Sequence, residues 1–239
     1  MGRHKKIITD LEKLSTRASE TILQDEENLN QTIKWIKDIL YADDNLVALA
    51  APQIGVDSRL FCIKFSGGDI RTFINPMIKG KKGMHLSREK CISIPGKEFI
   101  IPRYDEIEVI YQTPTAKIEE NVMKEAVGEV FQQMMHLLDG VLLSDLGLEV
   151  IEGWDEASEE EREEVIKVYL DGLKAANEGL KKEIEENKDT KALNDAIEFM
   201  KGVELGTVET YEEKPQLNRE QRRQLEKLKK IERRKYYKR

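Results

Sequence analysis

The chain has 239 residues, of which 39% are hydrophobic and 36% are charged, with a mean hydropathy of -0.57. This length allows one core of roughly 150 residues and a second, smaller module, and the charge predicts a large solvated surface. No apolar run approaches the roughly 20 residues of a membrane span, and the N-terminus lacks the apolar segment of a signal peptide. Two cysteines, Cys62 and Cys91, make no disulfide framework. We therefore expect a cytoplasmic protein in a reducing compartment, with no membrane partner.

The formal net charge of -7 is unevenly distributed along the chain. Residues 217–239 contain 11 Lys and Arg against 3 Glu, which gives +8 and leaves -15 on residues 1–216. Charge segregation of this kind is typical of an interaction tail. The tail residues that we expect to bind a partner are Arg219, Arg222, Arg223, Lys227, Lys229, Lys230, Arg233, Arg234, Lys235, Tyr236 and Tyr237.

The first 150 residues predict an α+β domain. Residues 26–44 place apolar side chains at helical spacing, so we expect an amphipathic helix with one buried face. Short β-type runs follow, broken by Gly, Pro and Asp, in the segments RLFCIKF, IRTFINPMI, KEFIIP and EIEVIYQT. The stretch EENVMKEAVGEVFQQMMHLLDGVLL then returns to the helical period. This order of helix, several strands and helix indicates an α+β fold.

From residue 151 the composition changes to that of a helical extension. Ser158 and Glu161 have the spacing of a capping box at a helix start, and a narrow apolar stripe follows them. A second helical pattern about KALNDAIEFMKG makes residues 151–206 a predicted acidic helical hairpin. Residues 207–216 are expected to be a linker, and residues 217–239 a basic helical tail with one apolar edge.

Three short segments of the first domain carry the chemistry. They are VALAAPQIGV at 47–56, EKCISIPG at 89–96 and FQQMMHLLDG at 131–140. In this order they resemble the three motifs of the peptide deformylase family, which are G-x-G-L-A-A-x-Q, E-G-C-L-S and Q-H-E-x-D-H-L-x-G. The resemblance covers roughly residues 7–148, and it implies a domain over 1–150 in which antiparallel strands surround a central helix.

The resemblance also implies a chemistry, which is removal of the formyl group from the N-terminal methionine of new chains. In the family the cysteine and two histidines hold a divalent ion, usually iron, whose bound water becomes the nucleophile. The glutamate between the histidines acts as general base and acid. The glutamine of the first motif and the backbone N–H after the cysteine stabilise the oxyanion.

This sequence departs from the family at the residues that matter most. Without a gap, Gln133 stands at the first histidine ligand, Met134 at the general base and Leu137 at the second histidine ligand. His136 lies one residue before the second ligand position, about 100° around the helix from it. The vestigial site positions are thus Gln53, Cys91, Ile92, Gln133, Met134 and Leu137. Neither this register nor a slip by one residue supplies three ligands and a carboxylate.

Three hypotheses follow from these departures. The first is a catalytically inactive member of the family that binds no metal or other cofactor and acts as a binding or structural component. Its partner would be another protein or a second copy of itself, and a bacteriophage virion or assembly factor would suit it. The second is an active deformylase whose iron or zinc is held by Cys91, His136 and an unrecognised third group. The third is a ribosome or RNA binder that acts through the basic tail.

Overall fold

The computed structural model describes residues 5–186. The chain divides into two compact units, Met1–Leu170 and Asp171–Arg239. The predicted divisions at residues 150, 206 and 216 stay predictions. The second helix of the predicted hairpin, the linker and the whole basic tail lie outside the described residues.

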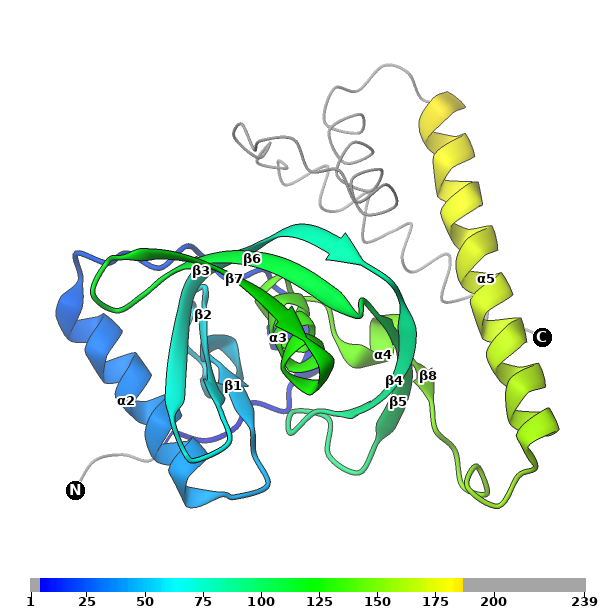
Figure 1. Ribbon diagram of the computed structural model, residues 1–239, viewed down its shortest axis with the longest axis horizontal. Helices are drawn as coiled ribbons and strands as arrows, with labels where there is room; N and C mark the ends of the chain where they lie inside the picture. Colours follow the sequence, from blue (N-terminus) through cyan, green and yellow to red (C-terminus); the bar gives the residue numbers. More distant parts are fainter. Residues whose placement is uncertain (1–4, 187–239) are drawn as a thin grey trace. The chain divides into compact units, whose positions relative to one another are not determined.

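The first unit is built on two antiparallel sheets (Figure 1). The larger sheet has the strand order β1-β2-β3-β6-β7, and the smaller has the order β4-β5-β8. The strands are β1 Ala48–Ala50, β2 Leu60–Lys64, β3 Ile70–Lys82, β4 His85–Lys90, β5 Glu98–Arg103, β6 Glu106–Gln112, β7 Ile118–Lys124 and β8 Leu148–Glu149. The four predicted β-type runs correspond to β2, β3, β5 and β6, so these four strand predictions are confirmed. The prediction that residues 119–124 begin a helix is wrong, because they form β7, and β4 was not predicted.

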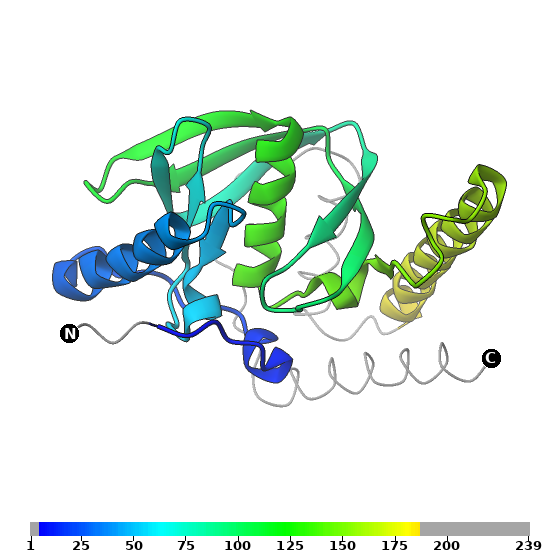
Figure 2. The ribbon, with the colours of Figure 1, turned by 90° about the horizontal axis from the view of Figure 1, so that it is seen from below.

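The helix α3, Glu125–Leu138, lies at the centre of the unit, between the two sheets (Figure 2). Most of its residues from 131 to 138 are buried, so more than one face of the helix is covered. Phe131 is fully buried and contacts the rings of Phe61 and Phe73 edge to face, with centroids 5.0 and 5.3 Å apart. Such pairs add about 0.5–1.5 kcal/mol beyond area burial. The predicted arrangement of antiparallel strands around a central helix is confirmed.

The helix α2, Glu26–Ala42, packs on the opposite side of the larger sheet. Asp25 accepts a hydrogen bond from the Asn28 N–H and so caps the helix start. The buried residues of this helix recur every three or four positions, as the sequence predicted; the apolar ones are Leu29, Ile33, Ile36 and Leu40. They form a second cluster with strand β2 and with the 3₁₀ turn η1, Ala51–Ile54.

The N-terminal segment closes the end of α3. The short helix α1, Leu11–Leu14, precedes a stretch in which the Ala18 N–H donates to the Leu138 carbonyl at 2.8 Å. Gly140 permits this approach, because a Cβ there would lie 2.7 Å from the carbonyl carbon of Thr16. Gly140 also has φ +71°, a conformation that side chains disfavour. The helical turn α4, Leu143–Leu146, then leads to β8.

A long C-terminal helix, α5 Glu159–Glu186, follows the two sheets. The predicted capping box is confirmed: the Glu161 N–H donates to Ser158 Oγ at 3.2 Å, and the Ser158 N–H donates to Glu161 Oε2 at 2.8 Å. Within the first unit, the Tyr169 hydroxyl donates to the Leu146 carbonyl, and Arg88 pairs with Asp155. Among the described residues, no helix is both long and apolar enough to cross a bilayer.

Candidate functional site

The first motif places Gln53 on the turn η1, next to strand β1. Its side chain is buried, and its Oε1 accepts from the Ala50 N–H at 2.9 Å. Its Nε2 donates to Ser93 Oγ at 3.1 Å and lies 3.6 Å from Cys91 Sγ. The structure therefore brings the predicted residues Gln53 and Cys91 together, although they are far apart in the sequence. Ile92, also predicted, is half-buried in the same turn.

Cys91 follows directly after β4 and is 8% exposed. Burial raises the pKa of its thiol, although hydrogen bonds with Ser93 oppose the shift. A metal ligand or nucleophile needs the thiolate, which an apolar surrounding disfavours. Cys91 therefore has the properties of a small buried side chain with a protonated thiol.

The ligand and base positions on α3 carry side chains that cannot perform those roles. Met134 is 2% exposed and Leu137 is 3% exposed, and both belong to the main apolar cluster of the first unit. Gln133 is half-buried, and its Nε2 donates to the Lys90 carbonyl at 2.9 Å, so this amide links α3 to the end of β4. The preceding Gln132 is also structural, since it accepts from the Tyr104 N–H and donates to the Tyr104 carbonyl.

His136 faces a buried ion pair. Arg103, fully buried at the end of β5, forms two hydrogen bonds with the Glu89 carboxylate, at 2.5 and 2.7 Å. Its Nη1 also donates to His136 Nδ1 at 2.9 Å, which makes that nitrogen an acceptor. Burial, followed by the charges of Arg103 and Lys81, lowers the pKa of His136 to about 3. This imidazole is neutral near pH 7, and it serves as a hydrogen-bond acceptor for the guanidinium.

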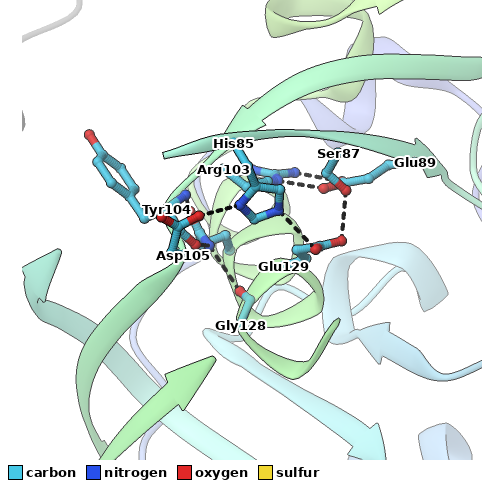
Figure 3. A network of polar contacts seen from close by, with 9 residues as sticks. His85, Ser87, Glu89, Arg103, Tyr104, Asp105, Gly128 and Glu129 are labelled. Carbon is cyan, nitrogen blue, oxygen red and sulfur yellow. Dashed lines mark hydrogen bonds and ion pairs between the residues drawn. The ribbon is translucent and has the colours of Figure 1, made fainter. Parts of the chain in front are cut away.

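His85, the other histidine of residues 5–186, contacts two carboxylates (Figure 3). Its Nδ1 contacts Asp105 Oδ1 at 2.6 Å, and its Nε2 contacts Glu129 Oε1 at 2.9 Å. Ser87 Oγ donates to the second oxygen of Glu129 at 2.7 Å. Hydrogen bonds to Asp105 and Glu129 raise the pKa of His85. This network connects β4 to α3 and to the start of β6.

The donors present do not fit the metal ion that the resemblance implies. The Cys91 thiol is protonated. Where the family has two histidine ligands, this chain has Gln133, whose amide donates to the Lys90 carbonyl, and Leu137, which is buried. His136 Nδ1 accepts a hydrogen bond from the Arg103 guanidinium, and a second positive charge near Arg103 and Lys81 would be repelled. Within residues 5–186, no group of three His, Cys, Asp or Glu side chains is placed to hold a metal. No reaction step through a metal can be built from these residues.

The sequence alone did not identify the roles of Arg103, Glu129 and Asp105. Arg103 directly follows the apolar run KEFIIP and carried no spacing signal, and its partner Glu89 appeared only as the first residue of the segment EKCISIPG. A charged residue directly after a buried run is the signal that could have indicated a buried ion pair, because burial of a charge requires a partner.

An open pocket of about 400 Å³ remains over the Cys91 turn. It is lined by residues between Lys90 and Glu98, and Cys91 and Ile92 form part of its wall. This volume is in the range of small-molecule sites. Its lining comes from the segment 90–98 and includes neither Gln53 nor a residue of α3.

Comparison with known proteins agrees with this geometry. The model of the polypeptide deformylase family matches residues 4–147, more than half of the chain. The peptide deformylase of Dictyoglomus turgidum is 30% identical over 145 residues, which cover 61% of this chain and 92% of that protein. The peptide deformylase of Pseudothermotoga lettingae is 36% identical over 119 residues, covering 48% of this chain and 68% of that protein. The crystal structure of peptide deformylase from Thermotoga maritima has a TM-score of 0.56 and 27% identity, and the match covers 61% of this chain and 98% of that one. From its motifs, its fold and these matches, the chain belongs to the polypeptide deformylase family.

Proposed function

We propose that this protein is a catalytically inactive member of the family that acts as a binding or structural component. The observation that carries this proposal is the state of α3, where the two ligand positions and the general base position hold Gln133, Leu137 and Met134. Two of these side chains are buried in the apolar core, and the third donates to a backbone carbonyl. Apolar packing at these positions avoids leaving unpaired polar groups inside the protein.

Two features around α3 support the proposal that the protein keeps the family's fold but not its catalytic activity. Gln53 still contacts the Cys91 turn, and the pocket over this turn remains open. In this proposal the pocket over the Cys91 turn is a binding surface, and no residue of α3 lines it. Long appended segments beyond residue 150 supply further surface for assembly with a protein partner. A role in a phage particle or its assembly is part of this proposal.

The test is metal content together with turnover. Protein purified without oxygen is expected to contain substoichiometric iron and zinc, and to leave a formyl-methionyl peptide intact with iron, nickel, cobalt or zinc added. Stoichiometric metal, with turnover abolished by Cys91→Ala, would overturn the proposal and support the active-enzyme alternative. An active family member assayed in parallel controls for the substrate and the metal.

A variant of α3 tests whether these three side chains are the reason that the protein is inactive. The triple substitution Gln133→His, Met134→Glu and Leu137→His returns the family's side chains to α3. If these positions are the reason for inactivity, this variant gains metal binding that the parent lacks, measured by metal analysis after desalting. Residues 217–239 are tested separately for RNA binding, since their deletion should remove any RNA affinity and its salt dependence.

A further inference from the structure

Within the described part of the chain, strand β7 forms an open edge of the larger sheet. It is the last strand in the order β1-β2-β3-β6-β7, so its partner in this sheet is β6 (Figure 2). Its burial pattern is exposed at every position except Met123. An edge strand presents a row of backbone N–H and C=O groups that can pair with a strand of another chain. β7 has seven residues, which is a usual length for a paired strand.

The two faces of β7 differ in chemistry. Met123 points to the core and is 9% exposed, and side chains alternate along a strand. Glu120, Val122 and Lys124 therefore share the outer face with Ile118. Val122 is 51% exposed. Along the outer face, two apolar side chains, Ile118 and Val122, therefore alternate with acidic Glu120 and basic Lys124.

We propose that β7 pairs with β7 of a second copy of this chain, antiparallel and centred on Val122. A twofold axis perpendicular to the sheet keeps both outer faces on one side and makes the contact self-complementary. Val122 then lies opposite the partner's Val122. Glu120 lies opposite the partner's Lys124, and Lys124 lies opposite the partner's Glu120. The contact joins the two five-stranded sheets edge to edge.

The charges select this register over its neighbours. A contact centred on Glu119 or on Glu120 would place that carboxylate opposite its own copy, and directly opposed like charges destabilise a strand pair. A contact centred on Asn121 would place Glu120 opposite Val122, without an ion pair. Because β7 ends at Lys124 and Glu125 turns into α3 with φ 51°, a contact centred on Met123 would pair only residues 122–124, whereas the contact centred on Val122 pairs residues 120–124.

Existing ion pairs would extend across the new contact. Within one copy, Lys79 pairs with Glu120 at 3.0 Å and Lys124 pairs with Glu106 at 2.6 Å. The Glu120 and Lys124 side chains remain 61% and 59% exposed. Pairing would alternate basic and acidic groups from Lys79 through Glu120 and the partner's Lys124 to the partner's Glu106. Charge networks contribute more than isolated surface pairs do.

This contact deepens the proposed assembly role, since it names a second copy as one partner. It uses no residue of the α3 site and is independent of the chemistry there. An active enzyme could form the same dimer, and an inactive one could fail to form it. Turnover and association are therefore measured separately.

The experiment is sedimentation velocity on the full chain over about 1 to 200 µM, the range in which a small interface dissociates. The unmodified protein is expected to form a dimer within this range. Glu120→Lys alone and Lys124→Glu alone each oppose like charges at both symmetric positions. Each is expected to weaken self-association by about tenfold or more, because two attractions become two repulsions.

Mixing the two variants provides the specific readout. In an equimolar mixture, each new side chain faces an opposite charge on the other variant, so heterodimers form where neither variant dimerises alone. Glu108→Lys is the control: it makes the same charge change on the exposed face of β6, opposite Val122 but one strand inside the edge. Thermal melts of each variant verify that it is folded.

Three results would overturn the proposal. They are a protein that stays monomeric up to the highest concentration, single variants that dimerise as tightly as the unmodified protein, and a mixture that stays monomeric. None of them bears on the absence or presence of turnover. Restored association in the mixture, with Glu108→Lys unaffected, would establish the β7 contact.

Discussion

Arg103 Nη1 donates a hydrogen bond to His136 Nδ1 at 2.9 Å, and the same guanidinium is bound to Glu89 through two further nitrogens. Three elements meet at this point: the end of β4, the end of β5 and the last turn of α3. Because Nδ1 is the acceptor, the imidazole is neutral and carries its proton on Nε2. His136 is therefore a structural residue, which accepts a hydrogen bond from a buried cation.

His136 should make the protein less stable in acid. Its pKa is about 3 in the folded state against 6.5 for the free side chain, so below pH 6.5 the unfolded chain binds a proton that the folded chain excludes. The stabilisation is complete above pH 6.5 and is lost as the pH falls toward 3. His136→Gln keeps a neutral acceptor and removes this titration. Urea unfolding at several pH values should give a shallower acid decline for the variant, and parallel curves would contradict the assignment.

The contribution of His85 to stability should have the opposite dependence on pH. Hydrogen bonds to Asp105 and then Glu129 raise its pKa above 6.5 in the folded state. Its contribution is therefore fully present below pH 6.5, and it is lost as the pH rises through the folded-state pKa. Replacement by glutamine should flatten the alkaline side of the stability profile while the acid side is unchanged. A titration of the His85 ring by NMR would contradict this if its pKa were at or below 6.5.

Breaking the buried ion pair should cost much of the protein's stability. Arg103→Met leaves the Glu89 carboxylate, only 9% exposed, without its guanidinium, and such losses cost about 3–5 kcal/mol. Denaturant unfolding measures the change. The double variant Arg103→Met with Glu89→Leu removes both charges and should recover part of the loss. A single variant within about 0.5 kcal/mol of the parent would show that the pair is not held in this form.

The two thiols should react slowly in the folded protein. Burial raises the pKa of Cys91, and it raises the pKa of Cys62 to about 11 with Thr72 opposing the shift. At about pH 7.5, iodoacetamide should label neither residue at the rate of a free thiol, because the thiolate is the reactive form. Mass spectrometry before and after unfolding in guanidinium gives both rates. Rapid labelling of Cys91 alone would indicate an activated thiolate and would count against the inactive site.

Met134 should tolerate apolar but not charged replacement. Met134→Leu conserves volume and should cost less than about 1.5 kcal/mol. Met134→Glu places an unpaired carboxylate among core residues, so it should destabilise the protein and shift its own pKa upward. Chemical denaturation of both variants at neutral and acid pH separates these effects. Equal stability of the two would mean that the position is open to water.

Helix α2 and strands β2, β3, β5 and β6 could be predicted because their signals are local, whereas residues 119–124, which form β7, were predicted to be helical. Leu29, Ile33, Ile36 and Leu40 lie at helical spacing, and all four are buried on α2. The departures from the family's ligand positions were also visible, since Gln133 and Leu137 stand where the family has histidines. Side-chain contacts between segments far apart in the chain leave weaker signals in the sequence. The ion pair of Arg103 with Glu89 is one such contact, and it was not predicted.

The sequence by itself determined the family motifs, the α+β order of elements and the side chains at the former ligand positions, because these depend on residue identity and spacing. Only the tertiary structure decided that His136 faces Arg103, that His85 is held between two carboxylates, and that β7 is an open edge. Side-chain environment and strand order arise from contacts between segments far apart in the chain. Their energies depend on burial and on the partner groups present, which no local pattern specifies.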